Sequence, residues 1–112
     1  MTITKEIDNH TVTLRLEGNL TYTQRKAFQE MLKAVSIDPM EHIIINLSQV
    51  PFLDSAALGL LMISHRQLLA EKRRLSLAYP QPTVRQIIEL ASLQKTIPLI
   101  ESDVPSLAKK SA

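Results

Sequence analysis

Residues 43–63 read IIINLSQVPFLDSAALGLLMI, a stretch that predicts a buried strand, a short loop and a buried helix. Residues 43–47 are a mostly β-branched run, interrupted only by Asn46, which is typical of a central strand covered on both faces. Pro51 restricts the loop that follows. The helix is expected from about residue 55 to 72. Its first half is apolar nearly all round, so we expect it to pass through the core and reach the surface in its second half.

A half-buried strand is predicted before this unit. Val12, Leu14 and Leu16 alternate with polar residues, which is the period of a strand with one buried face. Residues 2–7 are expected to pair with this strand through a turn at residues 8–10, where Asn9 suits a tight turn. The sequence therefore opens with a hairpin.

An amphipathic helix is predicted over residues 23–36. Phe28, Leu32 and Val35 recur at helical spacing, and Thr21 or Thr23 could cap the start of the helix. The pair at residues 38–39, Asp-Pro, is expected to end it.

Three elements and a tail are predicted after residue 74. They are a strand over 75–79, a short helix over 84–91 and a last strand over 97–101. The last strand should lie at the sheet edge because Pro98 cannot donate a ladder hydrogen bond. Residues 102–105 resemble the start of a final short helix capped by Ser102 or Asp103, with a frayed tail at about 108–112.

The predicted order is β-β-α-β-α-β-α-β-α. Strand and helix alternate after the hairpin, which predicts an α/β fold with a mostly parallel sheet of four to five strands and about four helices. A chain of 112 residues is expected to form a single domain over 1–112.

Composition limits the classes of function. The chain has no cysteine, which excludes disulfides, thiolate metal sites and a cysteine nucleophile. A polar N-terminus and the lack of an apolar run near ~18 residues predict a soluble cytoplasmic protein without a membrane span. A net charge of +2 and 4% aromatic residues disfavour nucleic-acid binding. One core uses most of the apolar pattern, so we expect a monomer.

Catalytic and cofactor patterns are absent from the sequence. His10, His42 and His65 are far apart in the chain, and no two have the spacing of a metal pair. Gly18 and Gly59 are the only glycines, so a phosphate-binding loop of the P-loop or Rossmann type is excluded. We therefore expect no catalytic residue, no metal and no cofactor, and a protein that is not an enzyme.

Residues 52–60 (FLDSAALGL) are the candidate functional segment, because they join the central strand to the buried helix. Asp54 and Ser55 can both cap that helix, and capping alone would explain them. Asp54 is a sufficient cap, however, which leaves Ser55 free for another role. Ala56 and Ala57 leave the hydroxyl accessible to a partner.

The same segment resembles the signature of the STAS family, the bacterial anti-sigma-factor antagonists. That signature is a hydrophobic pair followed by Asp-Ser, two small residues and Leu-Gly, as in residues 52–59 here. Residues 16–21 are similar to the family turn after the second strand, residues 42–50 to its central strand, and residues 88–99 to its helix-loop-strand near the C-terminus. The resemblance covers about residues 3–107.

The resemblance implies a partner switch. Ser55 is then the position that an anti-sigma factor with Ser kinase activity phosphorylates. The unphosphorylated domain binds that kinase and frees a sigma factor, and a PP2C-type phosphatase resets the switch. We expect the partner surface to include Asn19, Thr21, Phe52, Asp54, Ser55, Ala56, Ala57 and Leu58.

The later positions of the predicted helix are assigned either to the core or to the contact surface. Ser64 and His65 are further candidates for an exposed contact surface. Leu60, Leu61 and Ile63 are expected in the core, and Met62 could belong to the core or to the interface.

Three residues depart from the family pattern. Thr21 stands where many members carry Asp, and Ala57 and Ser92 stand where many carry Gly. The missing charge at Thr21 points to a divergent regulator as partner. The alternative function is a phosphorylation-independent STAS binding module of a transporter or sensor complex, and a nucleotide-binding or enzymatic domain is the least supported hypothesis.

Overall fold

The computed structural model describes residues 2–36 and 40–101. A five-stranded sheet forms its centre, with the strands in the spatial order β1-β2-β3-β4-β5. β1 pairs antiparallel with β2, and the other three pairings are parallel. The strands are β1 (Thr2–Asp8), β2 (Thr11–Glu17), β3 (His42–Gln49), β4 (Arg74–Ala78) and β5 (Leu99–Ile100).

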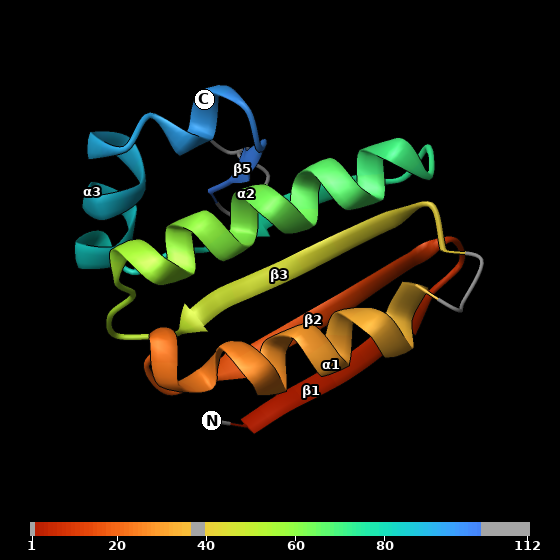
Figure 1. Ribbon diagram of the computed structural model, residues 1–112, viewed down its shortest axis with the longest axis horizontal. Coiled ribbons are helices and arrows are strands. Elements are labelled where there is room, and N and C mark those ends of the chain that lie inside the picture. Colours follow the sequence, from red (N-terminus) through yellow and green to blue (C-terminus); the bar gives the residue numbers. More distant parts are fainter. Residues whose placement is uncertain (1, 37–39, 102–112) are drawn as a thin grey trace, which may run out of the picture.

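The described residues form three α-helices and two 3-10 helices. The α-helices are α1 (Arg25–Ser36), α2 (Ser55–Ala70) and α3 (Pro82–Leu90), and the 3-10 helices are η1 (Tyr22–Gln24) and η2 (Leu93–Lys95). Figure 1 shows α1 and α2 lying along the sheet. The sheet is mixed and not parallel throughout, because the antiparallel hairpin of β1 and β2 forms one of its edges. The predicted final helix from Ser102 or Asp103, and the tail at 108–112, lie outside the described residues.

The hairpin and the edge position of the last strand are confirmed. Residues Thr2–Asp8 pair along the full length of β2, and Asn9 in the turn has the left-handed φ of 56° that Asn tolerates. β5 is the outermost strand beside β4. It is shorter than the predicted strand over 97–101 and begins after Pro98, which cannot donate a ladder hydrogen bond.

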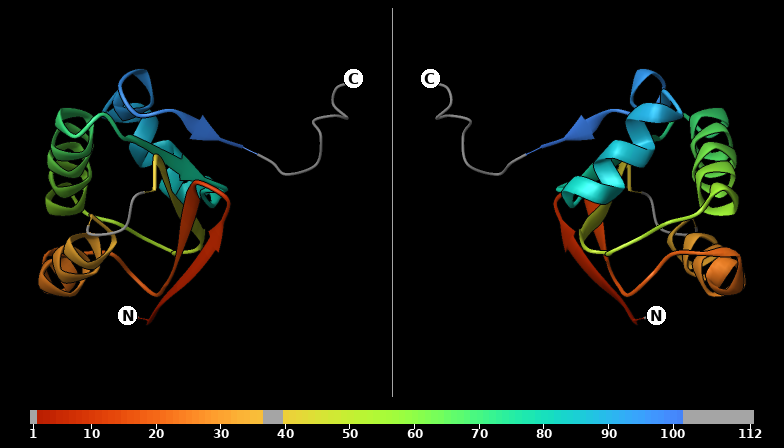
Figure 2. Two further views of the ribbon diagram at one scale, coloured as in Figure 1. Left: turned by 90° about the vertical axis from the view of Figure 1, so that its right-hand side faces the viewer. Right: turned by 90° about the vertical axis from the view of Figure 1, so that its left-hand side faces the viewer.

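The hydrophobic core lies between one face of the sheet and the helices α1 and α2. Figure 2 shows both helices on this same face. Val12, Leu14, Ile43 and Ile45 point toward them and are fully buried, together with Phe28 of α1. Burial of such side chains contributes on the order of 1.5–3 kcal/mol each.

The opposite face of the sheet differs from the prediction for the central strand. Ile44 of β3 and Thr13 of β2 point to this face and are only half-buried. Among the described residues, no helix packs over this part of the sheet (Figure 2). The prediction of a strand covered on both faces is therefore wrong for the part of the chain that the structure describes.

The rotation of α2 also differs from the prediction. Ile63, expected in the core, is 51% exposed, whereas Ser64, expected at the surface, is 2% exposed. The buried Ser64 hydroxyl donates a hydrogen bond of 2.8 Å to the carbonyl of Leu60. Leu60 and Leu61 are buried as expected, and Met62 is half-buried. A helix that is apolar all round has no polar face to define its rotation, which explains the error.

Candidate functional site

Two loops are joined at the carboxyl ends of β2 and β3. The N–H of Leu20 donates to the carbonyl of Phe52 at 3.0 Å, and the carbonyl of Leu20 accepts from the N–H of Asp54 at 3.3 Å. The side chains of Leu20 and Leu53 are both fully buried. Segments more than thirty residues apart therefore form one rigid surface at this end of the sheet.

Gly18 makes the first turn of this surface possible. Its φ is 109°, a conformation that residues with a Cβ rarely adopt. Its N–H donates to the carbonyl of Gln49 at 3.0 Å, which ties the end of β2 to the end of β3. The turn directs the chain from β2 toward α1.

Asp54 links the starts of two helices. Its Oδ1 accepts a hydrogen bond of 2.9 Å from the N–H of Ala57, so Asp54 is the N-cap of α2, as predicted. Its Oδ2 accepts a second bond of 3.1 Å from the N–H of Tyr22, at the start of η1 and α1. Figure 1 shows the starts of α1 and α2 together beside the tip of β3. One carboxylate therefore fixes both helices.

Ser55 is the first residue of α2 and is exposed. Because Asp54 caps the helix, the Ser55 hydroxyl is not needed for that purpose. Within the described ranges no residue accepts a hydrogen bond from the N–H groups of Ser55 or Ala56. Free N–H groups and the helix dipole at such an end favour a negative charge. The position is therefore accessible and lies at a helix end whose dipole favours an anion.

Thr21 holds the start of α1. Its N–H and its Oγ1–H both donate to Oε1 of Gln24, at 3.1 and 2.6 Å. The Gln24 side chain reaches back to the N-cap as in a capping box, and the N–H of Gln24 donates to the backbone carbonyl of Thr21 at 2.9 Å. The Thr21 hydroxyl therefore has a structural role at this helix start.

The remaining predicted contact residues divide by exposure. Asn19 is exposed and Phe52 is 43% exposed, so both belong to the accessible surface around Ser55. Ala56 and Leu58 are half-buried. The methyl group of Ala57 is 1% exposed and lies in the core, so only the backbone of Ala57 borders the site. His65 is half-buried and lies further along α2, beyond the predicted contact residues around Ser55.

Tyr22 is a surface residue that the sequence analysis missed. Its side chain is 58% exposed, and the guanidinium carbon of Arg25 lies 4.1 Å from the centre of its ring, a cation–π contact. Its backbone N–H binds Asp54, so the ring stands next to the start of α2. The capping signature at residues 21–24 was the available signal, because it places Tyr22 at the first position of the helix.

Metal-binding clusters and membrane-spanning helices are both absent from the part of the chain that the structure describes. No group of three or more His, Asp or Glu side chains in 2–36 and 40–101 is arranged to hold a metal ion. In the same ranges, none of the helices combines the length and the apolar character that crossing a bilayer requires.

Curated relatives cover most of the chain. A STAS-domain containing protein of Pseudomonas aeruginosa (strain UCBPP-PA14) is 26% identical over 88 residues, which are 79% of this chain and 86% of that protein. An anti-sigma F factor antagonist of Paenibacillus polymyxa is 23% identical over 112 residues, covering 97% of this chain and 96% of that protein.

Solved structures share the fold. An anti-sigma factor antagonist from Mycobacterium paratuberculosis has a TM-score of 0.82 and 26% identity, covering 96% of this chain and 92% of that one. The antagonist SpoIIAA in its unphosphorylated form has a TM-score of 0.77 and 24% identity, covering 97% and 95%. Its phosphorylated form, from Bacillus, has a TM-score of 0.70 and 22% identity, covering 99% and 100%.

The family assignment rests on the extent of the match. Residues 2–106 match the model of the STAS domain, which includes every element described above and the loops that carry Asp54 and Ser55. The chain belongs to the STAS domain family.

Proposed function

We propose that this chain is an anti-sigma factor antagonist that phosphorylation of Ser55 switches off. The unphosphorylated form binds an anti-sigma factor with Ser kinase activity and thereby frees a sigma factor or another downstream regulator. The observation that carries the proposal is the exposed Ser55 hydroxyl at the first residue of α2, beside an Asp54 that already caps the helix.

The physical effect of the phosphate is local. It adds a charge of about −1.5 to −2 next to the carboxylate of Asp54. The N–H groups at the start of α2 favour that charge, so the fold should persist. The surface formed by Tyr22, Phe52 and Ser55 changes from nearly neutral to strongly negative. A partner that buries Phe52 then has to desolvate a dianion, which abolishes binding.

The relatives support the general role. A protein from Paenibacillus polymyxa and structures that share this fold are named as anti-sigma factor antagonists. SpoIIAA has been solved both with and without phosphorylation. The proposal includes a monomeric, non-enzymatic single domain in the bacterial cytoplasm, without a cofactor or a nucleic-acid ligand, and a PP2C-type phosphatase that removes the phosphate.

A pull-down from the native cell tests the proposal. Wild type, Ser55→Ala and Ser55→Asp are compared as baits, and mass spectrometry maps phosphate on the wild-type chain. We expect a kinase-like anti-sigma factor on wild type and on Ser55→Ala, its loss with Ser55→Asp, and phosphate on Ser55. Equal capture by all three baits and an unmodified Ser55 would instead indicate a constitutive binding module of a transporter or sensor complex.

A further inference from the structure

The outer face of α2 is apolar although it is exposed to solvent. Surface helices normally present charged and polar residues on this side. Here Ile63 is 51% and Leu69 is 56% exposed, and the only charged side chain on this face is Arg66. The residues of this α2 outer face are Ser55, Gly59, Met62, Ile63, Arg66, Leu69 and Ala70. The face begins at the proposed phosphorylation site and continues along the helix.

Gly59 lies on this face, and nothing within the described residues requires a glycine at this position. A Cβ added at this position would meet no atom within 4 Å, and the backbone of Gly59 does not need a positive φ. Glycine in the interior of a helix is less stable than alanine because it has more conformational freedom to lose. A bare backbone one turn after Ser55 therefore leaves room for something outside the chain to approach α2 closely.

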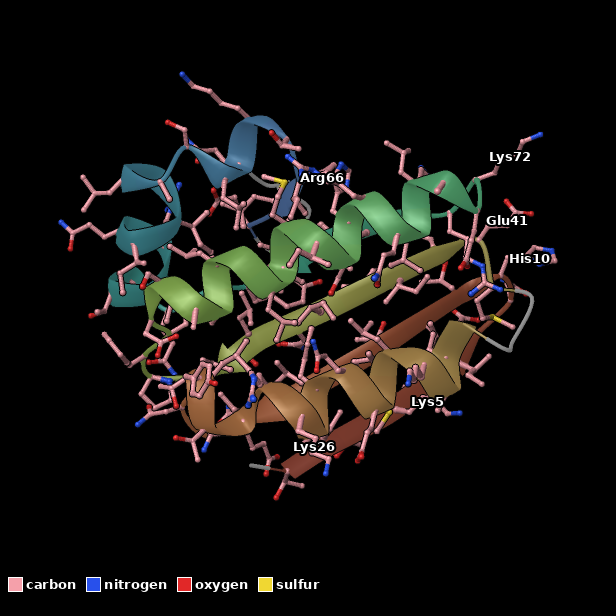
Figure 3. The ribbon with its side chains drawn as sticks, viewed as in Figure 1. Lys5, His10, Lys26, Glu41, Arg66 and Lys72 are labelled. Atoms are coloured by element: carbon pink, nitrogen blue, oxygen red, sulfur yellow. The ribbon has the colours of Figure 1, made fainter. Side chains whose placement is uncertain are left out.

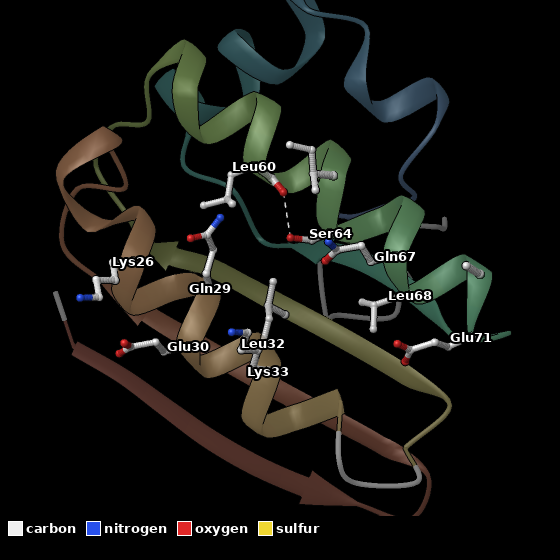
Figure 4. Close-up of a pocket in the computed structure, with 12 residues that line it drawn as sticks. Lys26, Gln29, Glu30, Leu32, Lys33, Leu60, Ser64, Gln67, Leu68 and Glu71 are labelled. Atoms are coloured by element: carbon white, nitrogen blue, oxygen red, sulfur yellow. Dashed lines mark hydrogen bonds between the residues drawn. The ribbon is translucent and has the colours of Figure 1, made fainter.

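A groove between α1 and α2 borders the same face. Its volume is about 730 Å³, and Ile63 contributes to its wall. Figure 4 shows Leu32 from α1 and Leu60 and Leu68 from α2 along the groove, with Gln29 and Gln67 at its sides. Charged side chains of both signs also line the groove, namely Lys26, Glu30, Lys33 and Glu71. Apolar residues between polar rims are typical of a site for an amphipathic segment.

The groove rims carry charges of both signs, so the charge that favours an acidic partner segment is that of Arg66 on the α2 outer face. Arg66 is exposed and forms no ion pair with any described residue. Lys26 lines the groove from α1, and Figure 3 shows it at the opposite edge of the helix pair from Arg66. A partner carboxylate would gain a charge-assisted hydrogen bond from Arg66.

We propose that an α-helix of the partner docks on the α2 outer face. The helix presents apolar side chains to Gly59 and Ile63, reaches the groove beside Ile63, and carries a carboxylate opposite Arg66. The close approach over Gly59 explains the missing side chain, and the position of Ser55 at the end of the same face explains how a phosphate disrupts docking. This inference rests on the proposed function, since the partner is the same anti-sigma factor.

Titration calorimetry with the purified partner recovered on wild type tests the docking face. Gly59→Leu should weaken the Kd at least about tenfold, because its side chain fills the space that the partner helix needs. The same substitution should raise the Tm by a few degrees, because leucine is the better helix former. Arg66→Glu should also weaken binding at least about tenfold, and Arg66→Lys much less. Leu90→Ser is the matched control, since Leu90 of α3 is 84% exposed and lies outside the face.

A second readout uses the absence of cysteine from the chain. A thiol-directed photo-crosslinker on Ile63→Cys has only one site to label, and it should capture the partner, whereas the same reagent on Leu90→Cys should not. If Gly59→Leu and Arg66→Glu bind like wild type while Ser55→Asp does not bind, the docking face is wrong and the gating by Ser55 stands. If every recovered partner also binds Ser55→Asp, the proposed function is wrong, and the inference is wrong with it.

Discussion

The carboxylate of Asp54 accepts a hydrogen bond of 3.1 Å from the backbone N–H of Tyr22, which lies 32 residues earlier in the chain. The other oxygen of the same carboxylate caps α2. The Asp54 side chain therefore adds to the backbone bonds between Leu20 and residues 52–54 in fixing the position of Ser55 relative to α1. A partner that contacts both helix starts would bind a surface that is already formed.

Replacing Asp54 tests this link. Asp54→Ala removes the N-cap and a second hydrogen bond, so the free energy of unfolding should fall by about 2 kcal/mol. Asp54→Asn can still cap α2 and should lose about 1 kcal/mol or less. Urea unfolding followed by circular dichroism measures both variants. A loss below about 0.5 kcal/mol for Asp54→Ala would show that the bridge between the helices contributes little.

The aromatic residues beside Ser55 should dominate partner binding. Phe52 and Tyr22 are 43% and 58% exposed, and partly exposed aromatic rings are common centres of binding energy. Phe52→Ala should weaken the Kd for the anti-sigma factor by about tenfold or more and leave the Tm nearly unchanged. Surface plasmon resonance measures the affinity, with Leu90→Ala as the control. Binding equal to wild type would move the interface away from this end of the sheet.

Replacing Ser92 with glycine should stabilise the fold. Ser92 follows the end of α3 with a φ of 57°, the left-handed conformation that glycine adopts at many helix ends. Ser92→Gly removes the steric cost of the Cβ, so the free energy of unfolding should rise by about 0.5–1 kcal/mol. A β-branched residue tolerates this conformation least, and Ser92→Val should destabilise the fold. A lower Tm for Ser92→Gly than for wild type would contradict the assigned backbone conformation.

His42 should make stability depend on pH. Burial, and secondly the charge of Arg74, lower the pKa of His42 below 6.5, and its Nε2 lies 2.7 Å from the Ser76 hydroxyl. The unfolded chain therefore binds the proton more readily than the folded chain. The free energy of unfolding should be unaffected by this group well above pH 6.5 and should fall as the pH drops below that value.

The comparison with His42→Gln isolates that contribution. Urea unfolding at about pH 7.5 and about pH 5.5 should show a smaller loss of stability for His42→Gln than for wild type. His10→Gln, in the exposed β1–β2 turn, serves as the control for removal of a histidine. Equal losses in wild type and His42→Gln would mean that His42 has the same proton affinity in both states.

Sequence periodicity predicted most of the fold because the hairpin and α1 are clearly patterned. Val12, Leu14 and Leu16 alternate with polar residues, and all three are fully buried. The prediction for β3 was wrong for a physical reason. A continuous apolar segment looks the same whether one or both of its faces are covered, so the half-buried state of Ile44 could not be deduced.

The candidate site was predictable in its side chains and less so in its backbone contacts. Asp54 as N-cap followed from residue type and position. The bond from Tyr22 to Asp54 could not be predicted, because every residue except proline offers a backbone N–H and sequence carries no mark of which one is used. The rotation of α2, and with it the exposure of Ile63, could not be predicted either, because it depends on tertiary packing.

Affinity for the anti-sigma factor, with and without phosphate on Ser55, tests the central claim most directly. The chain is purified in its unmodified form and after stoichiometric phosphorylation, and isothermal titration gives the Kd of each form. The account predicts tight binding of the unmodified chain and at least about a hundredfold loss on phosphorylation, with an unchanged far-UV circular dichroism spectrum. Equal affinity of the two forms would contradict the account and would leave Ser55 as a residue that only begins a helix.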